Sequence, residues 1–314
     1  MLYDLLRPVR TAAHRAMGPA VVGVVAASFA ACGSSASSTH SSPLAARPAS
    51  VAKPALPTVL VLTQTLGFHH MSIPAAMATV RAIAARSQRY RVVFLTSAAQ
   101  LTPVALRHAV AVMFLLTTGE LPMKAADKRA LVAFVRGGGG LIGVHSATDT
   151  FHHWGAFKEM IGAEFSHHPH PSTQRVTVTD HSTPATHSLP ASFRIDEEFY
   201  VFKHDPRPHV HVLAELDTGS GGPDRPLVWC RGFGRGRVYY DALGHFSATW
   251  HTQYQLTLMS GGIQWAAGLA DTTGCSTPSA RARPAPRLSR CSAGWAAAGA
   301  ARRWEPVTCS RRGG

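Results

Sequence analysis

The stretch Gly137-Gly-Gly-Gly-Leu-Ile-Gly-Val-His145-Ser-Ala-Thr-Asp149 decides the fold of this chain of 314 residues. A run of glycines leads into a short apolar segment, which ends at an imidazole, a hydroxyl and a carboxylate within five residues. In open α/β sheets, ligands bind beyond the carboxyl ends of the strands. The stretch therefore predicts a strand at 141–144 and a ligand-facing loop that begins with His145.

Apolar strands alternate with helical patterns on both sides of this stretch. Strands are expected at 59–62, 92–95, 109–116 and 141–144, and helices at 73–86 and 123–136. This alternation indicates βαβ units, and strands that are apolar on both faces indicate a parallel sheet covered by helices. After residue 170 the pattern changes to alternating strands, a β-hairpin with its turn at Gly232-Phe-Gly-Arg-Gly236, and a closing helix at 253–267. We expect a single α/β domain over residues 58–270, with a mainly parallel sheet and an added β-hairpin.

The N-terminal segment has the composition of a bacterial secretion signal. Three arginines precede an apolar stretch at 17–31, which ends at Cys32. Phe29-Ala-Ala-Cys32 resembles the lipobox of bacterial lipoproteins, so residues 1–32 are expected to form a lipoprotein-type signal peptide with Cys32 as the lipidated residue. An ordinary signal peptide and a short membrane anchor are the alternatives, although the stretch is short for a spanning helix. Either signal predicts a protein outside the cytoplasm, anchored to the cell membrane by lipid or secreted.

Two further segments lie outside the predicted domain. Residues 33–57 are rich in Ser, Ala and Pro and are expected to form a disordered tether. Residues 271–314 combine Arg, Pro, Ala, Gly and Ser without periodicity. We expect a disordered basic tail there, and a reading-frame artefact is the alternative.

The net charge of +14 does not indicate a nucleic-acid-binding protein. Residues 58–271 hold 18 Lys and Arg against 15 Asp and Glu, a net charge of only +3, so the basic excess lies in the two ends. A nucleic-acid footprint requires a basic patch on the folded surface. We therefore expect no nucleic acid as the main partner. The oligomeric state does not follow from the sequence.

Cys230 is alone in the predicted domain, because the other four cysteines lie in the two ends of the chain. With no partner inside the domain, we expect a buried free thiol on a strand. A redox role for this thiol is the alternative.

Short motifs follow one another along the domain. They are Gly67-Phe-His69, the stretch 138–149, Trp154, Gly162-Ala-Glu-Phe165 with His168-Pro169, Glu197-Glu-Phe-Tyr200, Pro226-Leu-Val-Trp229, Gly234-Arg-Gly-Arg-Val-Tyr239, Gly244-His245 and Trp265. Together they resemble the ThuA-like, or trehalose-utilisation, family. The resemblance covers about residues 58–268 and implies a flavodoxin-like three-layer sandwich related to class I glutamine amidotransferases. In those relatives a cysteine nucleophile follows the strand that here ends at His145, so amidotransferase chemistry is excluded.

His145, Glu198 and His245 are the expected catalytic residues. Both histidines follow predicted strands. Strand alternation would place one of Glu197 and Glu198 in solvent, and the resemblance favours Glu198 as the inward carboxylate. Imidazole and carboxylate can act as acid and base. Alternatively, the same three residues hold a divalent metal such as zinc, which takes three protein ligands and a water in catalytic sites. Each of the three could instead be a packed polar residue without a chemical role.

Five further residues are expected to bind substrate. They are His69, Asp149, Trp154, His168 and Tyr200. Aromatic rings can stack on a sugar face, although they more often pack in the core, and Asp149 could instead cap the next helix. The resemblance implies a small-molecule carbohydrate or keto-sugar as the ligand, with hydrolysis or isomerisation as the reaction. A non-catalytic sugar-binding or cell-envelope interaction module is the alternative.

Overall fold

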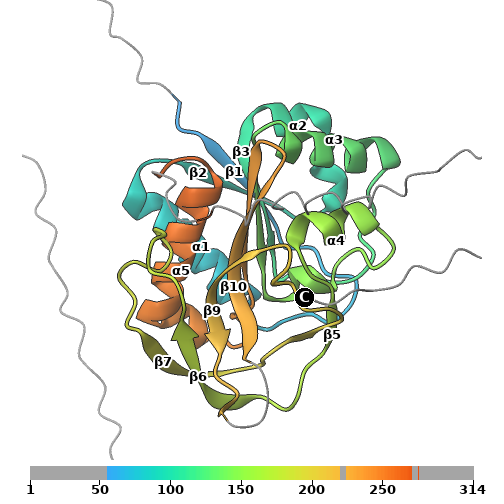
Figure 1. Cartoon of the computed structure of the whole chain (residues 1–314). Coiled ribbons are helices and arrows are strands. Elements are labelled where there is room, and N and C mark those ends of the chain that lie inside the picture. Colours follow the sequence, from blue (N-terminus) through green and yellow to red (C-terminus); the bar gives the residue numbers. More distant parts are fainter. Residues whose placement is uncertain (1–54, 220–223, 271–274, 276–314) are drawn as a thin grey trace, which may run out of the picture. The chain divides into compact units, whose positions relative to one another are not determined.

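A nine-stranded sheet forms the centre of the part of the chain that the computed structural model describes, residues 55–219, 224–270 and 275 (Figure 1). Its strand order is β2-β1-β3-β4-β11-β10-β9-β6-β7. The first five strands pair in parallel, and the last four continue the sheet in antiparallel pairs. The parallel strands are β1 (Thr58–Leu62), β2 (Arg91–Leu95), β3 (Ala109–Leu115), β4 (Gly140–Val144) and β11 (Gly236–Asp241).

Five α-helices cover the two faces of the sheet. α1 (Ile73–Ser87) packs beside α5 (Gln253–Ala266) on one face. The other face is covered by α2 (Pro103–Arg107), α3 (Ala125–Arg136) and α4 (Gly155–Ile161), as Figure 1 shows. β1 and β4 are buried along their whole length, because helices lie over both of their faces. The expected flavodoxin-like three-layer α/β sandwich is confirmed.

The glycines of β4 have a packing role. A Cβ atom at Gly140 would lie 2.3 Å from the carbonyl oxygen of Ala266 in α5, and one at Gly143 would lie 2.5 Å from the side chain of Ile161 in α4. Helices approach the strand closely from both faces at these two positions, and at Gly140, where the neighbour is backbone, only glycine fits. The glycine-rich stretch therefore holds β4 at the centre of the sandwich.

The antiparallel part of the sheet contains the expected hairpin. β10 (Arg225–Phe233) pairs with β11 across a turn at Gly234 and Arg235. The remaining strands of this part are β6 (Ser172–Val178), β7 (Ser192–Glu197) and β9 (His211–Leu216). A separate pair joins β5 (Phe165–His167) and β8 (Val201–Phe202). The sequence pattern did not indicate α2, α4, β5 or β8, all of which are short.

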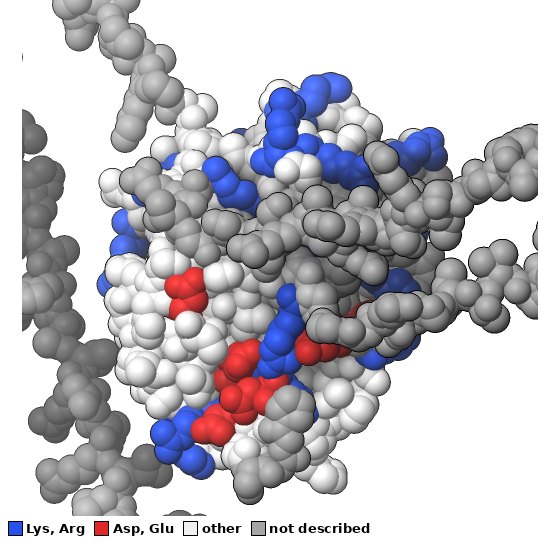
Figure 2. Space-filling model, in the orientation of Figure 1, with Lys and Arg blue, Asp and Glu red and all other residues white. Residues whose placement is uncertain are grey.

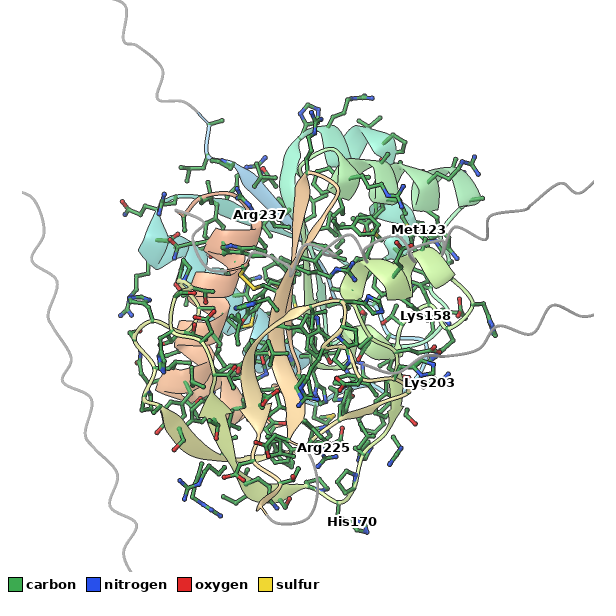
Figure 3. All side chains as sticks on the ribbon, viewed as in Figure 1. Met123, Lys158, His170, Lys203, Arg225 and Arg237 are labelled. Carbon is green, nitrogen blue, oxygen red and sulfur yellow. A yellow bond between two sulfur atoms is a disulfide. The ribbon has the colours of Figure 1, made fainter. Side chains whose placement is uncertain are left out.

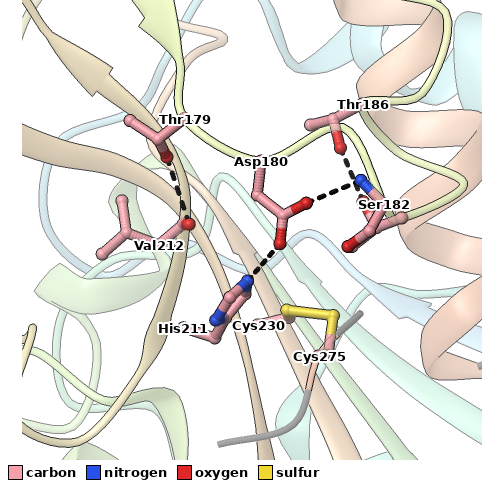
Figure 4. The surroundings of a disulfide bond; sticks show 9 residues. Thr179, Asp180, Ser182, Thr186, His211, Val212, Cys230 and Cys275 are labelled. Carbon is pink, nitrogen blue, oxygen red and sulfur yellow. Dashed lines mark hydrogen bonds and ion pairs between the residues drawn. A yellow bond between two sulfur atoms is a disulfide. The ribbon is translucent and has the colours of Figure 1, made fainter. Parts of the chain in front are cut away.

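The expectation of a free thiol at Cys230 is wrong. Cys230 on β10 forms a disulfide with Cys275, which lies beyond α5 in the segment expected to be a disordered tail (Figure 4). The tail-like composition after residue 270 does not predict an ordered cysteine, whereas Cys275 is bonded to β10. Cys230 therefore has no free sulfhydryl for the thiol role. The signal peptide, the lipidated Cys32, the tether up to residue 54 and the rest of the tail lie outside the described residues.

Charges are distributed unevenly over the face drawn in Figure 2, with Lys and Arg side chains over α2 and α3 and Asp and Glu side chains lower in the view. Among the described residues, no helix is both long enough and apolar enough to cross a membrane.

Candidate metal centre

Three loops bring histidines to one edge of the sheet. His70 lies in the loop after β1, His145 directly follows β4, and His245 lies four residues beyond β11. These three strands are parallel, so their carboxyl ends share an edge. Glu198 reaches the same place from the end of β7. One possible ligand atom from each of these four residues, the candidate metal centre, lies within 4.8 Å of those of the other three.

His145 is held in a defined orientation at the end of β4. Its backbone has a φ of +49°, which is rare outside glycine and turns the chain sharply away from the strand. Its Nδ1 lies 2.7 Å from the carbonyl oxygen of Ala242, which can only accept a hydrogen bond. Nδ1 therefore carries a hydrogen, and Nε2 is directed into the centre. A carbonyl behind the ring is a common arrangement for metal-binding histidines.

Two ring nitrogens in the centre are buried without a hydrogen-bond partner. Nε2 of His145 lies 3.4 Å from a carboxylate oxygen of Glu198, and Nδ1 of His245 lies 3.1 Å from the same oxygen. Despite these distances, neither nitrogen makes a hydrogen bond of acceptable geometry. The ring of His70 is edge-on to both, with centroids 4.8 Å from His145 and 5.3 Å from His245. The side chains therefore surround a common space, in which Glu198 lies at ion-pair distance from both His145 and His245.

The protonation states of His70, Glu198 and His245 favour the binding of a cation. Burial lowers the pKa of His70 to about 3, with help from His145 and His245, so His70 is neutral at neutral pH. Burial raises the pKa of Glu198, but the neighbouring His145 and His245 lower it more, so the carboxylate is ionised. Glu198 in turn raises the pKa of His245 against the effect of burial. A proton on His245 can balance Glu198, and a bound metal ion would replace that proton.

The side chains around the centre become more exposed toward His168, and we call this side the opening. The side chain of His145 is 0% exposed, that of Glu198 8% and that of His245 17%. The sequence-predicted His168 lies at the opening, with Nε2 3.2 Å from the other carboxylate oxygen of Glu198 and a side chain 38% exposed. Tyr200, also predicted, is buried, and its ring centroid lies 4.3 Å from that of His145.

Three of the residues expected to bind substrate do not join the centre. His69 is exposed and contacts Thr65. Asp149 pairs with His152 at 3.2 Å. Trp154 packs against Phe151 and Phe157 on the α4 side. Sequence reasoning selected His69 and missed its neighbour His70, although two adjacent histidines after a strand were visible.

The expectation that one of Glu197 and Glu198 is solvated is wrong. Glu197 is 0% exposed and Glu198 is 7% exposed. β7 alternates, which turns Glu197 inward together with Phe193 and Ile195. The strand ends at Glu197, so alternation no longer applies to Glu198, and both carboxylates point inward.

The other histidine pairs do not form a second centre in the described part of the chain. His170 is exposed at the lower edge of the molecule (Figure 3), and His211 pairs with Asp180 near the disulfide (Figure 4). A high histidine content is therefore a weak signal, and burial at the strand ends is the stronger one.

Residues 58–266 match the family model described as ThuA, trehalose utilisation, so the chain belongs to the ThuA family. Among solved structures, it is similar to a ThuA-like protein from Bacteroides uniformis ATCC 8492, with 22% identity and a TM-score of 0.59 over 73% of this chain and 98% of that one. A ThuA-like protein from Parabacteroides merdae ATCC 43184 has 18% identity and a TM-score of 0.58 over 70% and 93%. At these identities the likeness shows the fold alone. The comparison with curated protein sequences gives no significant match.

Proposed function

We propose that this protein is an exported enzyme of the ThuA family that acts on a carbohydrate or keto-sugar with a divalent cation held by His70, His145, Glu198 and His245. The observation that carries the proposal is a pair of buried nitrogens, on His145 and His245, that make no hydrogen bond and face the carboxylate of Glu198 and the neutral ring of His70. Buried polar atoms without partners are rare and call for an explanation. A bound ion supplies one.

The donor set fits zinc best among common ions. Imidazole nitrogens with one carboxylate oxygen are typical zinc ligands. Zinc at about 2.0–2.1 Å from each ligand would place the ligand atoms about 3.3 Å apart, so the widest separation of 4.8 Å must close by about 1.5 Å. Rotation of side chains can supply such a movement. When bound, the ion would polarise a carbonyl or hydroxyl oxygen of the substrate.

Glu198 connects the centre to the solvent-facing side. One of its oxygens faces His145 and His245, and the other lies 3.2 Å from Nε2 of His168. His168 is partly exposed, and an imidazole is a suitable general acid or base. We assign Glu198 and His168 to proton transfer at the opening, as hydrolysis or isomerisation of a sugar requires.

An exposed aromatic ring at the opening supports a sugar as the ligand. Phe68 is 63% exposed, and its ring is nearly parallel to that of His245, with an interplanar angle of 17° and a centroid distance of 6.4 Å. Hydrogen bonds from the backbone of Leu66 and Gly67, and to that of Phe68, tie this loop to Thr118. A fixed apolar ring beside polar groups suits the C–H face of a pyranose. Of the aromatic residues that the sequence predicted to bind substrate, Tyr200 is buried and Trp154 packs on the α4 side.

Export is supported by the disulfide as well as by the N-terminal pattern. Disulfides persist in oxidising compartments outside the cytoplasm, and Cys230 with Cys275 forms one. We propose lipid attachment at Cys32. Incorporation of radiolabelled palmitate by the native protein and its loss in Cys32→Ser would support the anchor, and equal membrane association of both forms would contradict it.

The function is tested with purified protein on disaccharides and their 3-keto derivatives. The expected result is metal-dependent turnover that is lost in His145→Ala and in Glu198→Gln and retained in the matched control His170→Ala. Sugar binding without turnover by the wild type, weakened in His145→Ala, would instead support a non-catalytic sugar-binding module. No binding and no turnover of any of these sugars would contradict the proposal.

A further inference from the structure

Glu197 is a buried carboxylate that is not one of the four residues of the candidate metal centre but contacts two of the segments that form it. Its side chain is completely buried, on the inward face of β7. It accepts hydrogen bonds from four donors, three of them backbone N–H groups. A buried carboxylate with this many donors is strongly fixed in place.

The donors belong to the segments that carry Glu198 and His245. One oxygen of Glu197 accepts from the N–H of Glu198 at 3.0 Å and from the N–H of His245 at 3.2 Å. The other accepts from the N–H of Gly244 at 3.0 Å and from the hydroxyl of Thr249. A single carboxylate therefore binds the backbone of two candidate metal ligands that lie 47 residues apart in the chain.

The same segment connects onward to the other two ligands. The carbonyl of Gly244 accepts from the hydroxyl of Ser72, two residues after His70, at 2.8 Å. The carbonyl of Ala242 contacts the ring of His145 at 2.7 Å. A displacement of residues 242–245 would therefore be felt at all four ligands.

We propose that Glu197 is a positioning residue that fixes Glu198 and His245 at the separation a metal ion requires. The inference rests on the proposed metal centre and deepens it, because Glu197 itself touches neither the ion nor the substrate. Only a carboxylate satisfies all four donors. An amide of the same shape has one acceptor oxygen, so Glu197→Gln would direct an NH₂ group at two of the donors.

The test is metal affinity and geometry rather than activity. Zinc binding is measured by calorimetry, and Co²⁺ is used as a spectroscopic substitute whose visible absorption reports coordination. We expect Glu197→Gln to weaken zinc binding by about 10–100-fold, the usual effect of losing a partner of a metal ligand, and to shift the Co²⁺ spectrum. Glu215→Gln is the matched control, since Glu215 accepts from Arg207 outside the centre, and it should bind zinc as the wild type does.

Thr249 provides a milder pair of variants if Glu197→Gln does not fold. Thr249→Val removes one donor to Glu197 and should weaken zinc binding, whereas Thr249→Ser keeps the hydroxyl and should restore it. Equal zinc affinity and equal Co²⁺ spectra in wild type, Glu197→Gln and Thr249→Val would overturn the inference and leave the metal centre standing. Absence of zinc and cobalt binding by the wild type would overturn the metal centre itself, and the inference with it.

Discussion

Two clusters of histidines and carboxylates lie near the end of β4, and they differ in how their charges are satisfied. In the candidate metal centre, two buried imidazole nitrogens lie around one carboxylate without making a hydrogen bond. In the second cluster, which we call the surface network, Glu164 pairs with Lys158 at 3.0 Å and with Lys203 at 2.7 Å, and His152 bridges to Asp149. Figure 3 labels both lysines on the side of α4.

The comparison shows that residue type alone does not define a site. Both clusters contain His, Asp or Glu within a few ångströms of each other. In the surface network, Glu164 is neutralised by two lysines, Lys158 and Lys203, which carry their charge without a ligand. In the metal centre, Glu198 faces imidazoles instead, and two of their buried nitrogens make no hydrogen bond.

The largest expected effect separates the two clusters directly. His145→Ala should weaken zinc binding by more than about 100-fold, the upper value for partners that only support a ligand, because it removes a ligand. His152→Ala in the surface network should leave zinc affinity unchanged. Calorimetry and metal analysis of both purified variants check this. A similar decrease in zinc affinity in His152→Ala would show that the two clusters do not differ in this way.

The next prediction compares the effect of pH on two carboxylates. Burial raises the pKa of Asp241 to about 7, against hydrogen bonds from Leu243 and Gln255, and nearby Glu197 raises it further. The unfolded chain loses this proton near its ordinary pKa of 3.8 while the folded protein keeps it, so stability should fall as pH rises from about 4 to about 7, by a few kcal/mol, roughly. Asp241→Asn should flatten this part of the profile, because an amide does not titrate. The variant should still fold, because the side-chain oxygen of Gln255, which lacks a hydrogen-bond partner, can accept from the new amide.

Glu164 in the surface network should behave in the opposite sense. Burial raises its pKa, but Lys203 and Lys158 lower it more, to about 2. The stability that it contributes is present above its ordinary pKa of 4.5 and is lost as pH falls from there toward 2. Thermal unfolding of wild type, Asp241→Asn and Glu164→Gln between pH 3 and 8 measures both effects. Parallel profiles for all three proteins would show that neither carboxylate is perturbed as described.

Phe68 tests whether the open side of the metal centre recognises a sugar. Phe68→Ala should raise the KM or Kd for the sugar by about 2–10-fold, because an aromatic contact contributes about 0.5–1.5 kcal/mol, and should leave zinc affinity unchanged. Phe68→Tyr should restore sugar binding. Unchanged sugar affinity in Phe68→Ala would place the ligand elsewhere.

The smallest effect is expected in the surface network. Lys203 is half exposed, and removing it leaves Glu164 with Lys158. Lys203→Ala should therefore cost about 0–1 kcal/mol of stability, the usual range for exposed ion pairs, which denaturant unfolding can measure. A loss of several kcal/mol would mean that this network, too, depends on every partner.

Much of the fold was predictable from the sequence, because continuous apolar strands and amphipathic helices record burial locally. The strand ends also led to His145 and His245, and the family resemblance selected Glu198. His70 was not predictable, because its inward position depends on a loop tied to Thr118, about 50 residues further along the chain. Glu197 was misplaced because the last residue of a strand cannot be read from alternation alone. The disulfide was missed because Cys275 lies in a segment of tail-like composition.

X-ray absorption spectroscopy of the zinc-loaded protein tests the central claim most directly. The account predicts one zinc ion per chain, with about three imidazole nitrogens and one carboxylate oxygen at about 2.0–2.2 Å, and the loss of this signal in His145→Ala. A protein that takes up no stoichiometric zinc, or whose zinc signal is the same in His145→Ala, would contradict it.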